Sequence, residues 1–439
     1  MIDGSLIQHK IYYTLVMKRK GRIYLTTVTT LTITVLIASN AVTHGYIFGH
    51  FDMVQDVLAQ PTIEKDPALK VESLVSGLSS PTSMTFLNNN NILVLEKDGN
   101  VRLVSNGQLR QQPVLQVSVD VKSERGLLGI AVMNTTGNNK EVFLYYTESK
   151  GEDIRNRVYR YDWNGQTLAN PKLLLDLPAL PGPNHDGGKL TLSNDGYLYA
   201  IIGELRHNGK LQNIKDGPDP DDTGVIFRVS PLDGSPAKNN PFATNNIAAM
   251  HKYYAYGIRN SFGIAIDPVT GNLWETENGE NTYDEINLVK PGFNSGWKIV
   301  MGPLSRNNGI TTNELVNFPG SHYADPVFSW LDPVAVTGIE FLKSSKLGPN
   351  YNNNIFVGDY NNGNLYFFKV NKDRTGIELD ADQKSAGLSD LVVDNKNELD
   401  AIKFGTGFGS ITDIKTGPDG WLYVLSFDDG AIYRISRGS

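Results

Sequence analysis

From about Val71 onward the chain repeats a short unit, in which a turn rich in Gly, Asn or Asp precedes a run of apolar and aromatic residues. A second turn and another short run follow, as residues 98–103 follow 91–95. Short runs of alternating apolar and polar positions between turn residues are typical of β-strands. The clearest runs are 91–95, 194–200, 270–274, 353–359 and 418–424.

The spacing of these units predicts the fold. They recur roughly 60 to 80 residues apart, a span that four short strands and their loops fill. Repeated four-stranded sheets are typical of β-propellers, which hide strand edges by radial repetition. We therefore predict an all-β, six-bladed β-propeller with four antiparallel strands per blade over residues 71–437. Two β-sandwiches are the alternative, which the lack of any linker or composition break in this part of the sequence disfavours.

Composition agrees with a turn-rich β protein and narrows its chemistry. The chain holds 43 Gly, 21 Pro, 20 Tyr and 17 Phe, and no cysteine. The absence of cysteine excludes disulfides, thiolate zinc sites, iron–sulfur clusters and cysteine nucleophiles. Any metal must therefore be held by oxygen or imidazole ligands.

The N-terminal segment has the pattern of a targeting sequence. A basic cluster at residues 18–22 precedes an uncharged stretch at 23–44. Basic residues before an apolar run remain in the cytoplasm, so we predict a cytoplasmic flank at 1–22 and an N-terminal membrane-targeting helix at 23–44. A linker at 45–70 would follow, with the propeller extracytoplasmic, either secreted after cleavage at Ala41 or membrane-anchored. A buried globular helix is the other interpretation of this stretch.

The charge balance excludes one class of partner. Five of the 40 Lys and Arg and one of the 47 Asp and Glu lie in residues 1–42, so the remainder carries a net charge of −11. Proteins that bind nucleic acid present basic surfaces. We therefore expect no nucleic-acid partner.

Three motifs carry candidate chemistry. His185 lies in a Pro- and Gly-rich loop, 180–190, directly before a predicted strand. A neutral histidine at a propeller mouth suits a general base, although a structural histidine would give the same pattern. Arg259 and Asn260 lie between a glycine turn and an apolar strand, where they offer a fixed charge and a two-way hydrogen-bonding group. The acidic stretch 275–287 could hold Ca²⁺ through oxygen ligands, or could simply be solvated.

The order of these motifs resembles the PQQ-dependent glucose/sorbosone dehydrogenase family, which includes soluble glucose dehydrogenase and the aldose sugar dehydrogenases. The resemblance runs from Glu72 to Arg437. Besides the loop of His185, it rests on the segments 77–84, 124–131, 256–263, 294–297 and 417–420. It implies an exported quinoprotein oxidoreductase that oxidises aldose sugars or related sugar alcohols, with PQQ and Ca²⁺ as cofactors and an external electron acceptor.

The resemblance also implies roles for individual residues. His185 matches the catalytic base, which takes the sugar hydroxyl proton while hydride passes to the quinone, and Arg259 matches the arginine beside the quinone carbonyls. The backbone carbonyls of Gly279 and Glu280 match the pair that ligates the catalytic calcium. Positions that face the cofactor are Glu124, where the family often has Gln, Asn260, Asn278 and Thr337.

The sequence departs from the family where PQQ carboxylates are bound. Asn361 occupies the position of a lysine, and the stretch 407–412, ending at Thr412, lacks the family's two arginines. A trianionic ligand needs its charge matched, so Lys189, Arg206 or Lys403 would have to substitute. We take Lys189 as the substitute that binds the cofactor. The alternative function is a propeller without redox activity that binds a glycan or a protein, and a calcium-dependent lactonase would need a carboxylate triad that we do not find.

Overall fold

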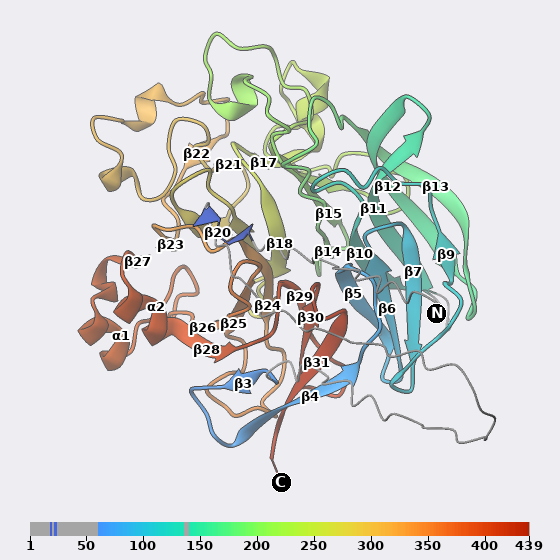
Figure 1. Ribbon diagram of the computed structural model, residues 1–439. Helices are drawn as coiled ribbons and strands as arrows, with labels where there is room; N and C mark the ends of the chain where they lie inside the picture. Colours follow the sequence, from blue (N-terminus) through green and yellow to red (C-terminus); the bar gives the residue numbers. More distant parts are fainter. Residues whose placement is uncertain (1–17, 20–21, 24–59, 136–139, 439) are drawn as a thin grey trace, which may run out of the picture. The chain divides into compact units, whose positions relative to one another are not determined.

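The structure is a computed structural model that describes residues 18–19, 22–23, 60–135 and 140–438 (Figure 1). Near the N-terminus, β1 (Lys18–Arg19) pairs antiparallel with β2 (Arg22–Ile23). Apart from Ile23, the predicted membrane-targeting helix lies outside the described residues. Within the described residues, no helix has the length and apolar character needed to cross a membrane.

The described residues from Gln60 onward belong to one compact unit built from six sheets of four to six strands. The first sheet contains β5 (Pro81–Asn88), β6 (Asn91–Glu96), β7 (Asn100–Ser105), β8 (Gln108–Leu109) and β9 (Leu115–Gln116). The second contains β10 (Leu127–Asn134), β11 (Lys140–Lys150), β12 (Asp153–Trp163) and β13 (Leu168–Leu177). The third contains β14 (Leu190–Leu192), β15 (Leu198–Ile202), β16 (Val225–Val229), β17 (Tyr253–Tyr256), β21 (Phe293–Asn294) and β22 (His322–Tyr323).

The remaining three sheets follow in chain order. The fourth contains β18 (Ser261–Ile266), β19 (Leu273–Glu277), β20 (Asp284–Val289), β23 (Phe328–Trp330) and β27 (Val392–Val393). The fifth contains β24 (Val336–Phe341), β25 (Ile355–Asp359), β26 (Leu365–Phe368), β28 (Lys403–Thr406) and β3 (Thr62–Ile63). The sixth contains β29 (Ile411–Thr416), β30 (Leu422–Ser426), β31 (Ala431–Arg437) and β4 (Leu69–Val75).

Helices are few and short in the described part of the chain. The α-helices are α1 (Ala381–Ala386) and α2 (Lys396–Ile402), which contact each other beside the fifth sheet (Figure 1). Single 3₁₀ turns occur at Lys210–Gln212, Ala248–Lys252, Leu304–Arg306, Thr312–Glu314 and Leu388–Asp390.

The first strands of the six sheets form a closed ring. β5 contacts β10, β10 contacts β14, and the contacts continue through β18, β24 and β29, which returns to β5. Figure 1 shows these inner strands around a common centre, with the other strands of each sheet fanning outward. This closed ring of packed sheets confirms the predicted all-β propeller, a fold in which radial repetition protects the strand edges.

The N-terminal residues of the unit help to close this ring. β4 pairs antiparallel with β31, and Arg434 donates to the Glu72 carboxylate at 2.6 Å across the pair. β3 pairs with β28 of the fifth sheet. The sheets therefore include residues of the range 45–70 that the sequence assigned to a linker.

The prediction of four antiparallel strands in every blade is wrong for four of the six sheets. Their extra strands are short, and β17–β21, β21–β22 and β23–β27 pair in parallel. The strands that pair in parallel come from long connections, whereas β8 and β9 follow β7 closely in the chain and β3 precedes the first sheet. All of them pair with strand edges that would otherwise leave N–H and C=O groups unpaired. The repeat in the sequence carries no signal for them because each is only two or three residues long.

Apolar side chains pack between neighbouring sheets and hold the blades together. Phe143 and Tyr145 of the second sheet share one buried cluster with Phe227 and Tyr253 of the third. Trp274 of the fourth sheet lies in another with residues of the fifth. These contacts fix the direction of the inner strands, so the loops that begin them meet at one end of the ring.

Candidate functional site

A cavity of about 680 Å³ opens where the inner strands begin. Residues just before or at the start of all six inner strands line it, as Thr82 does at β5 and Thr412 at β29. A second cavity of about 400 Å³ adjoins it, and His185 and Arg259 line both. Eight of the nine residues singled out in the sequence line the main cavity: Glu124, His185, Lys189, Arg259, Asn260, Asn278, Gly279 and Thr337. The ninth, Glu280, lines the adjoining cavity.

Close packing at Gly188 and hydrogen bonds of Asp186 hold the loop that carries His185 in place. His185 itself has a positive φ of 66°, and Gly188 follows with a φ of 105°. A Cβ on Gly188 would lie 2.7 Å from Leu128 Cβ, so only glycine fits there. The buried Asp186 accepts a hydrogen bond from Asn156 Nδ2 at 2.9 Å, and Tyr145 Oη donates to its carbonyl at 3.0 Å. Burial raises the pKa of Asp186 to about 6.

Both ring nitrogens of His185 have partners. Arg259 Nη2 lies 3.0 Å from Nε2, and the Glu204 carboxylate contacts Nδ1. Because a guanidinium only donates, Nε2 accepts from Arg259 and the proton of the neutral imidazole lies on Nδ1, facing Glu204. The ring is therefore oriented with its basic nitrogen toward Arg259, and only 13% of the side chain is exposed.

Arg259 is held on several sides. Its Nη1 donates to Asn278 O at 2.7 Å, its backbone N–H donates to Glu277 Oε1 at 2.6 Å, and its Cζ lies 5.2 Å from the centre of the Trp297 ring. Burial lowers the pKa of Arg259, and the surrounding carboxylates oppose that shift. Among the described residues, its Nε has no hydrogen-bond partner.

Glu124 connects His185 to Asn260. Its Oε2 accepts from the His185 backbone N–H at 2.7 Å and from Asn260 Nδ2 at 2.9 Å. Asn260 Oδ1 is buried and, within the described part of the chain, accepts no hydrogen bond. Buried polar groups are normally satisfied, so the unpaired acceptor and the unpaired Arg259 Nε favour a polar ligand beside them.

Much of the acidic stretch is buried beneath this site instead of being solvated. Glu275 and Glu277 of β19 and Glu285 of β20 are fully or almost fully buried. Asn287 Nδ2 donates to Glu275 and Glu285, each at 2.9 Å. Burial raises the pKa of Glu275 and of Glu277 to about 8, and that of Glu285 also rises.

The turn that holds the predicted calcium ligands is rigid. Gly279 N–H donates to Asp284 Oδ1 at 3.0 Å, while Asp284 Oδ2 accepts from the backbone N–H groups of Val334 and Ala335 at 2.8 and 2.7 Å. In the described ranges no group of three or more His, Cys, Asp or Glu side chains could hold a metal. The predicted ligands are backbone carbonyls of Gly279 and Glu280, so the calcium site stays a prediction.

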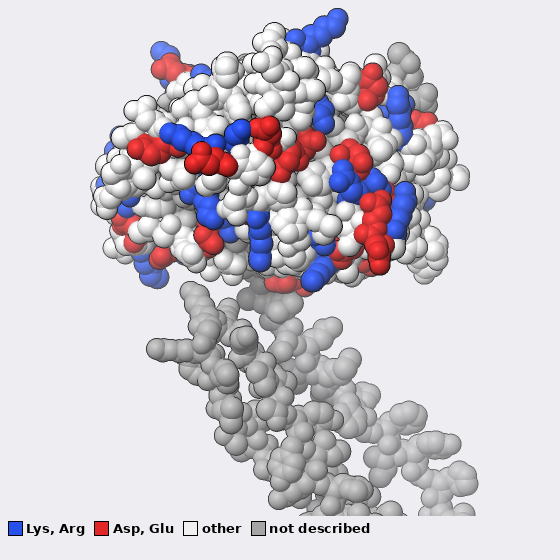
Figure 2. All heavy atoms as spheres, turned by 90° about the horizontal axis from the view of Figure 1, so that it is seen from above, with Lys and Arg blue, Asp and Glu red and all other residues white. Residues whose placement is uncertain are grey.

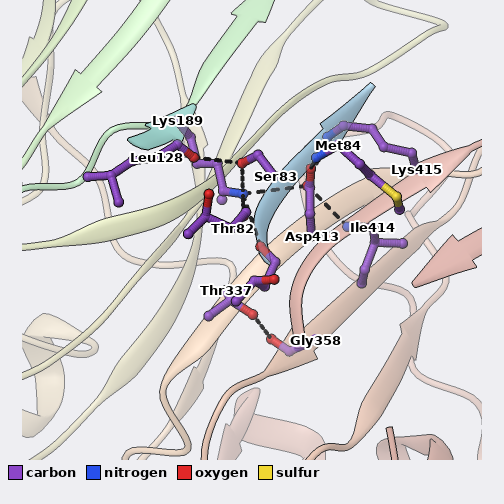
Figure 3. Close-up of polar contacts among 12 residues, drawn as sticks. Thr82, Ser83, Met84, Leu128, Lys189, Thr337, Gly358, Asp413, Ile414 and Lys415 are labelled. Atoms are coloured by element: carbon purple, nitrogen blue, oxygen red, sulfur yellow. Dashed lines mark hydrogen bonds and ion pairs between the residues drawn. The ribbon is translucent and has the colours of Figure 1, made fainter. Parts of the chain in front are cut away.

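Lys189 enters the main cavity, but its ammonium is fully engaged (Figure 3). Nζ donates to Thr82 O at 2.9 Å, Ser83 Oγ at 2.5 Å and Thr412 O at 3.0 Å, which uses all three N–H groups. Asp413 Oδ1 lies 3.7 Å away. Burial lowers the pKa of Lys189 to about 8. The ammonium is therefore not free to donate to a cofactor.

Near positions 361 and 407–412, where the family binds the PQQ carboxylates, no cation with free N–H groups is found among the described residues. Thr412 lines the main cavity, with its hydroxyl donating to Pro81 O at 2.8 Å. Tyr360 also lines it, whereas the neighbouring Asn361 is exposed and does not. Thr337 Oγ1 donates to Ile411 O at 2.6 Å.

Arg206 and Lys403, the other residues considered as replacements for the missing PQQ-binding cations, lie outside the main cavity. Arg206 lines the adjoining cavity, and Lys403 pairs with Asp400 at 2.7 Å outside both cavities.

Three residues of the site were given no role on the basis of the sequence. Glu204 orients His185, and it follows β15, whose end lies near the loop of His185. Lys97 lines the main cavity with only the Val121 carbonyl, at 2.6 Å, as a described partner for its ammonium. Trp297 covers Arg259. Glu204 follows a predicted strand and could have been found from that position, but the other two depend on tertiary contacts.

Comparison with known proteins agrees with this arrangement. The chain is 26% identical to the aldose sugar dehydrogenase YliI of Escherichia coli over 84% of this chain and 93% of that protein. The crystal structure of the soluble aldose sugar dehydrogenase of Escherichia coli in its apo-form is similar, with a TM-score of 0.66 and 25% identity over 84% of this chain and 99% of that chain. The PQQ-bound aldose sugar dehydrogenase of Streptomyces coelicolor shares the fold, with a TM-score of 0.61 and 23% identity over 86% and 99%.

The family assignment follows from the match along the whole propeller. The glucose/sorbosone dehydrogenase family matches residues 78–434, from the turn before β5 to the middle of β31. This range includes the six inner strands and every lining residue discussed above. The chain belongs to the glucose/sorbosone dehydrogenase family.

Proposed function

We propose that the chain oxidises aldoses or related sugar alcohols, with PQQ as the hydride acceptor and His185 as the general base. The observation that carries this proposal is the contact of His185 Nε2 with Arg259, with the Glu204 carboxylate behind the ring. At the family level the chain is a sugar oxidoreductase, and the identity of the base and of the cofactor are our proposal.

His185 has the protonation state that a base needs. Its Nε2 carries a lone pair, and a sugar hydroxyl that approaches it would replace the N–H of Arg259, now 3.0 Å away. Glu204, at Nδ1, stabilises the positive charge that the ring gains with the proton. Arg259 is left beside the reacting oxygen, where a fixed positive charge stabilises developing negative charge.

The residues around Arg259 and Asn260, at one end of the main cavity, fit the quinone part of PQQ. Arg259 and Asn260 line the cavity, and each has a buried polar atom without a described partner, the donor Nε and the acceptor Oδ1. Polar atoms of a quinone ligand beside them would suit this pair. Carbonyls of Gly279 and Glu280 would hold Ca²⁺ beside them. On the wall of the same cavity, Lys97 has N–H groups without a described partner, whereas those of Lys189 are taken. We expect PQQ to bind, but weakly, because charge-assisted pairs are few.

The setting of the enzyme is also a proposal. We propose that each of the six sheets forms one blade, and that residues 23–44 direct the propeller out of the cytoplasm. The protein would then be secreted or remain membrane-anchored and pass electrons to an external acceptor. The face in Figure 2 shows Lys and Arg interspersed with Asp and Glu, and a continuous basic surface is missing from its described residues. The expected lack of a nucleic-acid partner stays a prediction.

An activity assay tests the function. The purified full chain is incubated with PQQ and Ca²⁺, and reduction of an acceptor dye is followed with a panel of aldoses and sugar alcohols. We expect sugar-dependent reduction that needs PQQ, and that chelation of Ca²⁺ lowers. Dye reduction that is equal without PQQ, or absent at all PQQ concentrations, would leave the non-redox binding propeller as the better description.

A further inference from the structure

A third cavity lies at the other end of the ring of inner strands. It measures about 400 Å³, and residues near the ends of all six inner strands line it. One residue from each strand defines it: Phe86, Ile130, Leu192, Ile266, Glu340 and Lys415. The main cavity is lined at the beginnings of the same strands, so the two cavities lie at opposite ends of the channel. We call this cavity the far-end cavity.

The far-end cavity holds an ammonium with unused hydrogen-bonding capacity. Lys415 Nζ lies 3.0 Å from Asp413 Oδ1, and among the described residues its other N–H groups have no partner. The side chain is 28% exposed. Lys343 stands at the rim, more than half exposed, with Glu340 Oε1 3.6 Å from its Nζ. Both Lys415 and Lys343 line the cavity.

Asp413 is shared between the two ends of the channel (Figure 3). It is buried, and it also accepts from the backbone N–H groups of Met84 at 2.9 Å and Ile414 at 3.1 Å. Figure 3 shows Lys189 and Lys415 on either side of this carboxylate. Two ammonium groups therefore depend on one carboxylate, at 3.7 Å and 3.0 Å.

The charges near the channel do not balance. Among the described residues, three ammonium groups, those of Lys189, Lys415 and Lys343, face two carboxylates, those of Asp413 and Glu340, which leaves an excess of one positive charge. A partly buried, unpaired charge is unfavourable, so an anion nearby would stabilise it. Such an anion would not bind directly to Lys189, whose three N–H groups are taken. Lys415, in the far-end cavity, can bind it.

We propose that the far-end cavity binds a small organic carboxylate through Lys415, with Lys343 at the rim. The single unbalanced positive charge matches a monoanion, and a carboxylate can accept two of the free N–H groups of one ammonium. Apolar residues such as Phe86, Ile130 and Ile266 line the same space, which suits a short hydrocarbon chain on the ligand. This site is separate from the sugar site and does not depend on the proposed redox activity.

Calorimetric titration of the full chain with sodium propionate tests the site, with sodium chloride at the same ionic strength as the reference. We expect saturable binding with a Kd on the order of 1 mM. Lys415→Met should weaken it about tenfold or more. The matched control is Lys346→Met, because Lys346 is an exposed lysine outside the cavity that donates to Asp419 O at 2.5 Å. The control should bind as the wild type does.

Two further arms keep the proposal falsifiable if Lys415→Met does not fold. Lys415→Arg, which keeps the charge, should retain binding within a few-fold, and Lys343→Met should weaken it a few-fold. Inorganic phosphate separates an organic carboxylate from a general anion site, and we expect it to bind more weakly than propionate. No saturable binding of propionate, equal binding by Lys415→Met, or tighter binding of phosphate would each overturn the proposal.

Discussion

The two sides of the main cavity differ in how their charges are used. On one side His185, Glu204 and Arg259 contact each other, and Arg259 keeps an N–H without a described partner. On the other side Thr412 and Tyr360 line the wall, and the nearby Lys189 is saturated by protein oxygens. The first side brings together the groups that we propose for the chemistry, whereas the second offers no free charge to an anionic ligand among its described residues. The proposed catalytic residues His185 and Arg259 and the anchoring position Thr412 lie at or just before the starts of inner strands of different sheets, so mutations can change one set separately from the other.

The largest expected effect comes from the side of the main cavity that holds His185, Glu204 and Arg259, which we call the histidine side. His185→Ala removes the base that takes the hydroxyl proton, so kcat should fall about 100-fold or more while PQQ affinity changes little. Steady-state dye reduction and PQQ titration measure the two quantities. His322→Ala is the control, because His322 is exposed on β22 and lines none of the described cavities. A kcat loss below about threefold would remove His185 from the chemistry.

The opposite side, lined by Thr412 and Tyr360, we call the anchoring side. Adding positive charge there should strengthen PQQ binding. Asn361→Lys combined with Thr412→Arg places cations where the family has them, and each charge-assisted pair contributes about 1.5–3 kcal/mol. We expect PQQ affinity to rise at least about 10-fold, which corresponds to one such pair, with kcat at saturating PQQ nearly unchanged. Asn106→Lys adds one charge in a distant turn and should leave the affinity unchanged. Equal affinities of the wild type and the double variant would contradict this account of the anchoring side.

The buried carboxylates beneath Arg259 predict a pH-dependent stability. Burial raises the pKa of Glu275 from its ordinary 4.5 to about 8. The folded protein then holds a proton that the unfolded chain has lost, so this contribution is full below about pH 4.5 and disappears as pH rises through about 8. Glu275 alone should lower the free energy of unfolding by about 2 kcal/mol between pH 6 and pH 8, and Glu277 adds to the same slope.

Glu275→Gln should remove part of that slope in denaturant titrations at each pH. Glu314→Gln, at an exposed position of a 3₁₀ turn, serves as the control and should leave the slope unchanged. A stability that rises from pH 6 to pH 8 in the wild type would show that these carboxylates are charged in the folded protein.

The smallest effect is expected at Glu124, which joins the two sides. A glutamine there keeps an oxygen that can accept from the His185 backbone N–H and from Asn260 Nδ2. It removes one negative charge from the cavity wall, so PQQ should bind about two- to fivefold more tightly, with kcat within about twofold. A large loss of kcat in Glu124→Gln would instead assign the carboxylate a direct role in proton transfer.

The sequence predicted the propeller and most of the wall of the main cavity, because turn–strand repeats and ordered motifs are local signals. It did not predict strands such as β21 and β27, whose two residues pair only after long connections have folded onto a sheet edge. It also assigned Lys189 to the cofactor. That side chain does reach the cavity, but its saturation by Thr82, Ser83 and Thr412 depends on residues far apart in the chain. Glu204 was missed although it follows a predicted strand, because nothing local shows that it contacts His185, 19 residues away.

Single-turnover reduction of bound PQQ tests the central claim, that the histidine side is competent even though the anchoring side is weak. The full chain is loaded with Ca²⁺ and with PQQ at a concentration that saturates binding, then mixed rapidly with an aldose, and quinone absorbance is followed without any electron acceptor. We predict one turnover per bound quinone, about 100-fold slower in His185→Ala. An unchanged absorbance in the loaded wild type would contradict the claim.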